Sequence, residues 1–481
     1  MVSGPSLSPF LLAHAQRTEA AARSVGLDFF EVLFEPLNAR DVNALAAWGG
    51  FPLRYASWRF GMEFERLHKG YSYGLSKIYE LVINNDPTIA YLVRSNSIME
   101  QKLVMAHVFG HADFFKHNTW FAPTERHMVD LMGRHAASMQ AIMDSVGQDE
   151  VERFLDAVLC LDTLIDPYLP QRDHLRIRSS GRSSDGLVER ARLSLESVLD
   201  GNPRGKVQNQ ANREGQPPTY DVLGFLIENA PLEAWQRAIA SIVRSEAYYF
   251  LPQRMTKIMN EGWATYWHSR LLTGGLLDPA EIVDFADCHA GATATGPGQL
   301  NPYKLGIELF RHAERRGMDL FQLRRIHNDV SFLDEVMDEE FAASSQLFLV
   351  QQDARSGAAQ VGTRDWQAVK AKLLENLAWC GAPRVELVGV DVDGRGELLL
   401  QHHHDGRDME ISEAGELLQH VATLWGAPVQ LLTQVEDQGR KVSVEGGEVR
   451  VVAFDRAGSD EGAAPGSEQD PEPPEVRPAA G

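Results

Sequence analysis

The sequence predicts an α+β protein, in which a mostly α-helical N-terminal domain precedes a small α/β C-terminal domain. In residues 28–356 apolar side chains recur at intervals of three and four, the period of an amphipathic helix. In residues 364–456 the period changes to the alternation of strands, broken by turn residues such as Asp-Gly. The content of 44% hydrophobic and 23% charged residues is typical of folded globular proteins. At 481 residues, the chain is long enough for two or more compact units.

The first helical block follows an N-terminal extension over residues 1–27. Ser97 and Glu100 have the spacing of a capping box, which predicts a helix that begins here and runs through His111. Within residues 71–87 a short helix is expected to end at Asn-Asp-Pro, with Tyr79 and Glu80 able to reach a shared site.

A polar insertion separates the two helical blocks. Residues 171–218 are rich in Arg, Ser, Gly, Asn and Gln, and we expect this stretch to be flexible. Asn229-Ala-Pro231 and Asp278-Pro279-Ala-Glu281 then predict two further helix starts, because proline suits the first turn.

The C-terminal domain, residues 364–456, is predicted to have a core of its own. Two strands about an Asp-Gly turn are expected in residues 386–402, and a helix over Glu413–Leu424. Three more strands are expected at Val429–Val435, Lys441–Val444 and Val449–Ala453. The tail, residues 457–481, has too few apolar residues to order and is predicted to be disordered.

Charge and cysteine content exclude several function classes. The 46 basic and 67 acidic residues give a net charge of −21, which argues against nucleic acid and anionic lipid as partners. Cys160, Cys288 and Cys380 are far apart, so neither a disulfide framework nor a thiolate zinc site is expected. No apolar run approaches the roughly 18 residues of a membrane span, and we expect a cytoplasmic protein without membrane insertion.

His107 and His111 lie one helical turn apart, so both imidazoles can bind one divalent ion. The alternative to metal binding is that the two histidines are polar residues hydrogen-bonded within a helical core. Glu261 follows in a helix rich in Trp and Tyr, where a buried carboxylate needs a partner, and an ion held by the two histidines would be one. A salt bridge to Arg244 or Arg254, or plain exposure, explains Glu261 equally well.

Other side chains are candidates for supporting roles around such an ion. The position after the first histidine, where metalloproteases carry a glutamate base, is Val108. Glu100 and Glu246 are the candidate catalytic bases, although capping and pairing with Arg244 explain them too. Asp113 is a candidate partner of the ligand histidines.

Three further groups of residues have competing interpretations. His268 lies on the face of Glu261, as a supporting or substrate-binding group or as an exposed residue at a helix end. His289 is a candidate near a glycine-rich loop, where a plain connection is the simpler interpretation. The run 402–404 of three histidines is expected at an exposed polar edge, with adventitious metal binding as the alternative.

Four segments of the chain closely resemble the stage V sporulation protein R (SpoVR) family. They are YSYGLSKIYELVINNDP (71–87), NSIMEQKLVMAHVFGHADFFKHN (96–118), the stretch 221–268 that ends in MNEGWATYWH, and LNPYKLGIELF (300–310). The resemblance implies a cytoplasmic protein linked to spore cortex formation or, in non-sporulating bacteria, to stationary-phase and stress responses. It also implies a serine protein kinase and a von Willebrand-type protein as partners.

The string EGWATY is similar to the EGWALY segment that supplies a glutamate ligand in certain zincin-like hydrolases. This likeness implies a zincin-like domain with one divalent metal, expected to be zinc, on His107, His111 and Glu261. Two hypotheses follow. The chain is a hydrolase of a peptide or peptidoglycan-precursor amide, or it is a non-catalytic module that binds a regulatory partner.

Overall fold

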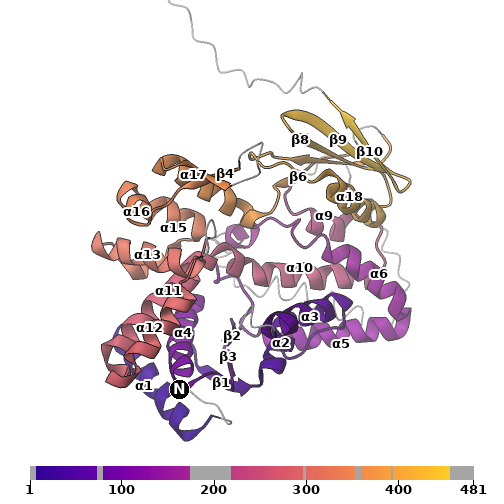
Figure 1. Ribbon diagram of the computed structural model, residues 1–481. Helices are drawn as coiled ribbons and strands as arrows, with labels where there is room; N and C mark the ends of the chain where they lie inside the picture. The colour runs from indigo at the N-terminus through magenta and orange to yellow at the C-terminus, as the bar shows by residue number, and fades with distance from the viewer. Residues whose placement is uncertain are drawn as a thin grey trace, which may run out of the picture.

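The computed structural model describes residues 7–72, 80–173, 218–295, 300–352, 359–391 and 394–454 (Figure 1). The architecture is α+β, with a mostly helical N-terminal part and a C-terminal sheet, as the sequence predicts. No helix in these ranges is long and apolar enough to cross a membrane.

The first part of the chain contains helices and a small sheet. Its elements are α1 (Pro9–Ser24), β1 (Val32–Leu37), α2 (Ala39–Ala47), α3 (Trp58–Ser72), β2 (Glu80–Ile83), β3 (Thr88–Val93), α4 (Ile98–His117), α5 (Met128–Val146) and α6 (Gln148–Leu159).

The second part is helical. Its elements are α9 (Val222–Asn229), α10 (Ala234–Met255), α11 (Lys257–Leu271), the π-helical turn η1 (Leu272–Leu276), the 3-10 turn η2 (Pro279–Glu281), α12 (Ile282–Ala292), α13 (Pro302–Arg315), α14 (Leu320–Ile326), α15 (Asp329–Val336) and α16 (Glu339–Ser344).

The sheet of the first part differs from the sequence prediction, which has residues 28–160 mostly helical. The strand order is β1-β3-β2, with β1 parallel and β2 antiparallel to β3. These strands have four to six residues, and periodicity cannot distinguish such short apolar runs from buried helix. Glu80 begins β2 rather than ending a helix. Tyr79 and the side chain of Glu80 lie outside the described residues.

The C-terminal part follows the predicted pattern closely. It contains β4 (Leu349–Gln352), β5 (Ala359–Thr363), α17 (Trp366–Leu377), the 3-10 turn η3 (Ala378–Gly381), β6 (Val385–Val390), β7 (Leu398–His402), α18 (Ile411–Trp425), β8 (Val429–Val435), β9 (Gln438–Glu445) and β10 (Glu448–Ala453). The main sheet has the order β10-β9-β8-β7-β6, with only β7 and β8 parallel. The long helix α18 connects this parallel pair, as a crossover requires.

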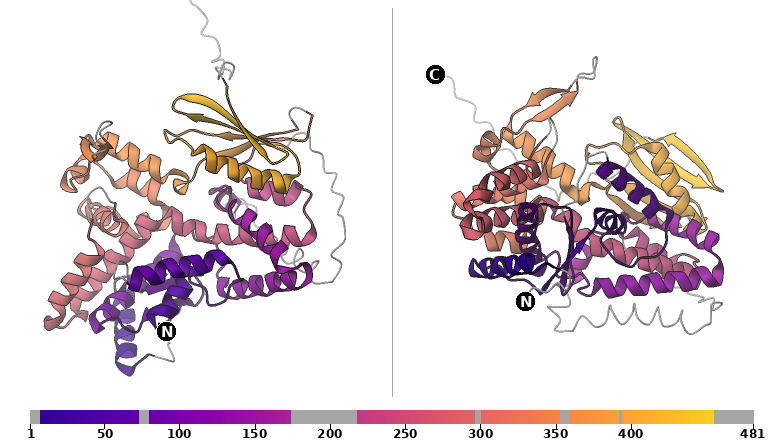
Figure 2. Two further views of the ribbon diagram at one scale, coloured as in Figure 1. Left: turned by 45° about the vertical axis from the view of Figure 1, so that its right-hand side comes forward. Right: turned by 60° about the horizontal axis from the view of Figure 1, so that its bottom comes forward.

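The C-terminal sheet shares its core with the helices instead of enclosing a separate one. Figures 1 and 2 show α18 on the side of the sheet that faces α9 and α10. Phe225 of α9 packs on Trp425 of α18, with ring centroids 5.7 Å apart. Buried residues of α6, α9 and α10 form one apolar cluster with the inner face of the sheet. A second cluster surrounds α1, α4, α11 and α13 and positions the candidate site.

Candidate metal site

Close packing between α4 and α11 brings the site residues together. The predicted capping box is present, since Ser97 Oγ accepts from Glu100 N and Glu100 Oε2 accepts from Ser97 N. Fifteen of the twenty residues of α4 are buried. A Cβ on Gly110 would lie 2.6 Å from Cα of Ala264, so only glycine allows this approach of the two helices.

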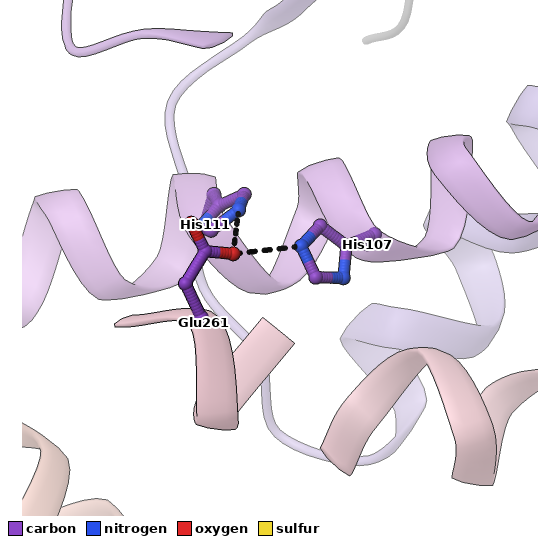
Figure 3. A group of neighbouring side chains, drawn as sticks. All are labelled: His107, His111 and Glu261. Atoms are coloured by element: carbon purple, nitrogen blue, oxygen red, sulfur yellow. Dashed lines mark hydrogen bonds and ion pairs between the residues drawn. The ribbon is translucent and has the colours of Figure 1, made fainter. Parts of the chain in front are cut away.

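His107 and His111 project from α4 toward Glu261 of α11 (Figure 3). Nε2 of His107 is 3.4 Å, and Nε2 of His111 3.5 Å, from the same carboxylate oxygen of Glu261. Two atoms that bind one zinc tetrahedrally at 2.0–2.1 Å are about 3.3–3.4 Å apart. The three ligand atoms all lie within 4.8 Å of one another, so their spacing fits a shared ion.

The other ring nitrogen of each histidine has a buried partner. His111 Nδ1 is 2.8 Å from Oδ1 of Asn260, an acceptor, which fixes Nδ1 as the protonated nitrogen and leaves Nε2 with its lone pair. His107 Nδ1 is 2.9 Å from Nδ1 of His268, whose Nε2 is 3.0 Å from Nδ1 of His289. If each neutral ring donates to the next in the order 107, 268, 289, the lone pair of His107 Nε2 also points to the site.

Burial keeps the histidines of this site neutral, as metal binding requires. Desolvation, together with His111 nearby, lowers the pKa of His107 to about 4. Burial likewise lowers the pKa of His268 and of His289. Burial opposes ionisation of Glu261, but the two histidines beside it outweigh burial and hold its pKa below the usual range. Neutral imidazoles and an ionised carboxylate are the ligand forms of a divalent ion.

Comparison with known proteins identifies the chain. A family model described as SpoVR like protein matches residues 9–382, and one described as SpoVR-like C-terminal domain matches residues 383–436. The chain belongs to the SpoVR family. The Escherichia coli (strain K12) protein named "Uncharacterized protein YcgB" is 30% identical over 468 residues, which cover 87% of this chain and 91% of that protein. No solved structure matches the chain.

In this SpoVR chain Asp113 lies elsewhere than the sequence analysis expects. Its carboxylate accepts from Trp263 Nε1 and Asp28 N, both at 2.9 Å, and pairs with Arg324 at 3.2 Å. Asp113 follows His111 by two residues, and Trp263 follows Glu261 by two. This buried bond therefore fastens α4 to α11 beside the site, instead of holding a ligand imidazole.

The candidate bases also have other partners. Glu100 is engaged in the capping box, two turns before His107. Glu246 is buried in α10 and paired with Arg54 at 2.7 Å and His135 at 3.1 Å. The suggested pairing of Glu246 with Arg244 does not form, because Arg244 pairs with Asp221.

Two supporting residues are missing from the sequence-based set. Asn260, beside Glu261, is the first, and its position before a ligand was the only available signal. Asp329 of α15 is the second: its carboxylate accepts from Ile258 N and Met259 N at 2.9 and 2.8 Å, which caps α11 one turn before Glu261. Nothing in the local sequence connects Asp329 with α11.

Proposed function

We propose that this SpoVR chain binds one divalent metal ion, zinc in the first instance, through His107, His111 and Glu261. The convergence of both Nε2 atoms on one oxygen of Glu261, at 3.4 and 3.5 Å, carries the proposal. Asn260 and His268 support it, because buried partners on the outer ring nitrogens are a regular feature of metal-binding histidines.

The proposed activity is hydrolysis of an amide bond in a zincin-like domain. A divalent ion here supplies a Lewis acid for a substrate carbonyl and for water. Within the described residues three side chains converge as ligands, the number that catalytic zinc sites take from the protein while the fourth position binds water or substrate. Val108, in the position of the usual glutamate base, is fully buried. The positions of Glu100 and Glu246 do not favour either as its replacement.

The proposed process is spore cortex formation or, outside spore formers, a stationary-phase or stress response in the cytoplasm. The family name supports sporulation. A peptide or a peptidoglycan-precursor amide is the substrate class that joins cortex assembly to amide hydrolysis.

The second candidate function is a non-catalytic module in which the ion or the histidine network stabilises a scaffold. The apolar residue at position 108 favours it, because a site for binding alone needs no base. The proposed partners are a serine protein kinase and a von Willebrand-type protein. Co-purification with the kinase that survives His107→Ala supports the scaffold, and absence of any association removes it.

Elemental analysis of purified, tag-free protein after dialysis in metal-free buffer tests the metal proposal. We expect about one equivalent of zinc, manganese or iron in the wild type and none in His107→Ala or Glu261→Ala. His117→Ala is the matched control, since His117 is also on α4 but pairs with Asp28 at 2.9 Å. A folded, metal-free wild type that cannot be loaded with zinc would contradict the proposal.

A hydrolase screen then separates the two functions. Turnover of peptide or peptidoglycan-precursor amides by the loaded wild type, with loss in Glu261→Ala and retention in His117→Ala, supports catalysis. A loaded protein without turnover that still binds the kinase supports the scaffold.

A further inference from the structure

A second concave site lies between the helical part and the C-terminal sheet. Its volume is about 470 Å³, within the usual range for small-molecule sites. The wall is formed by Cys160 after α6, by the loop that follows β7 and by the first turns of α18. It is far along the chain from the candidate metal ligands and belongs to a different apolar cluster.

Negative charge dominates the wall of this cavity. Asp405, Asp408 and Glu410 line it from the loop before α18, and Glu413 and Glu416 from α18 itself. Arg407 is the one Lys or Arg among the lining residues, and its guanidinium is already paired with Asp405. Asp408 is bonded to His404, and Glu410 accepts from Glu413 N at the start of α18. An occupant with positive charge would therefore meet chiefly the carboxylates of Glu413 and Glu416.

His402 is the independent observation that indicates a ligand. Its side chain lines the cavity and is only 3% exposed. Nδ1 is 2.8 Å from Thr433 Oγ1, whereas Nε2 has no hydrogen-bond partner among the described residues. Burial lowers the pKa of His402 to about 4, so the ring is neutral at pH 7 and, with Nδ1–H donated to Thr433, Nε2 offers a lone pair. The sequence-based expectation of an exposed polar edge is wrong for this histidine.

A metal ion does not suit this wall. Within the described ranges, His107, His111 and Glu261 form the one group of three or more potential ligands that converge closely. A larger cation that donates several hydrogen bonds can instead contact a buried imidazole and carboxylates on separate turns. Primary ammonium and guanidinium groups do so, since each carries positive charge and several N–H donors.

We infer that the cavity between α6, β7 and α18 binds an organic cation with ammonium or guanidinium groups, with His402 Nε2 as acceptor at its floor and Glu413 and Glu416 at its rim. The cation is either a free polyamine or a basic side chain of a peptide. Both sources share the recognising chemistry. The inference does not depend on the metal site.

Calorimetric titration of the full chain with spermidine, and separately with a capped dilysine peptide, tests this inference. At about 0.15 M salt, long-range attraction to the acidic protein is largely screened. We expect saturable binding of at least one of the two at a single site. Saturation by spermidine alone assigns a free amine, and saturation by the peptide alone assigns a docked side chain.

Three variants make the titration specific. His402→Asn keeps a polar group near Thr433 but removes Nε2, and we expect about tenfold weaker binding. Glu413→Gln with Glu416→Gln should weaken binding about fivefold. The control is Glu445→Gln with Glu448→Gln, which makes the same charge change on β9 and β10 outside the cavity, where these side chains are 58% and 73% exposed.

Two outcomes overturn the inference. The first is absence of saturable binding of either probe to the wild type. The second is equal weakening in the cavity pair and the control pair, which shows that net charge alone attracts the cation. Matching thermal unfolding of all variants and the wild type confirms that the comparison is between folded proteins.

Discussion

The state of the His111 imidazole depends on Asn260. Oδ1 of Asn260 lies 2.8 Å from His111 Nδ1 and selects the tautomer whose Nε2 lone pair faces Glu261. We predict that Asn260→Ala lowers zinc affinity about 10- to 100-fold, because removal of such an outer partner has this effect in other sites. Competition with a chromophoric chelator measures it.

Asn260→Asp is the matched variant, since its carboxylate still accepts from Nδ1–H. Its affinity should stay within a fewfold of the wild type. Equal losses in both variants, or no loss in Asn260→Ala, would contradict a tautomer-selecting role for Asn260.

At the scale of elements, the contact of α4 with α11 depends on Gly110. A Cβ at this position would lie 2.6 Å from Cα of Ala264, in the backbone of the facing helix, so the helices must separate. We predict that Gly110→Ala lowers the free energy of unfolding by about 1–3 kcal/mol and weakens zinc binding, because Glu261 moves away from both histidines. Urea unfolding and the chelator competition measure the two effects.

Gly61→Ala on α3 is the control for Gly110→Ala. A Cβ on Gly61 meets nothing within 4 Å, and alanine is the better helix former by up to about 1 kcal/mol. The control should therefore be neutral or slightly stabilising. A Gly110→Ala protein as stable and as zinc-competent as Gly61→Ala would show that the helices are not held at this contact.

Helices and strands that a short sequence pattern encodes could be predicted, whereas those that depend on contacts between distant residues could not. The capping box of α4 and the alternating strands of the C-terminal sheet are encoded within a few residues each, and the structure confirms them. The strands β1, β2 and β3 are short, and the pairing of β1 with β3 joins residues 56 apart. The spacing of His107 and His111 was visible in the sequence, whereas Asp329 reaches α11 only through tertiary packing.

For the molecule as a whole, two buried titratable groups outside the metal site make opposite contributions to the dependence of stability on pH. His14 is buried in α1, where Thr18, Arg17, Lys102 of α4 and Glu281 of η2 surround it. Burial and the charge of Lys102 lower the pKa of His14 to about 4. Asp329 caps the start of α11 beside Lys257, and burial raises the pKa of Asp329 to about 7.

The two groups oppose each other between pH 4 and 6.5. Here the unfolded chain protonates His14 and the folded chain does not, so this group adds stability as the pH rises. Asp329 has the opposite effect. The folded chain keeps a proton on Asp329 that the unfolded chain loses, so this group lowers the free energy of unfolding as the pH rises. Each contributes a slope of about 1.4 kcal/mol per pH unit, of opposite sign.

We therefore predict opposite changes from two near-isosteric substitutions in the metal-free protein. His14→Gln should make the rise of unfolding free energy between pH 4.5 and 6 shallower by about 1.4 kcal/mol per pH unit, and Asp329→Asn should make it steeper by a similar amount. Urea unfolding at several pH values measures both slopes. Parallel curves for the wild type and the two variants would show that neither group changes its proton affinity on folding, and a steeper slope for His14→Gln would reverse the sign assigned to that histidine.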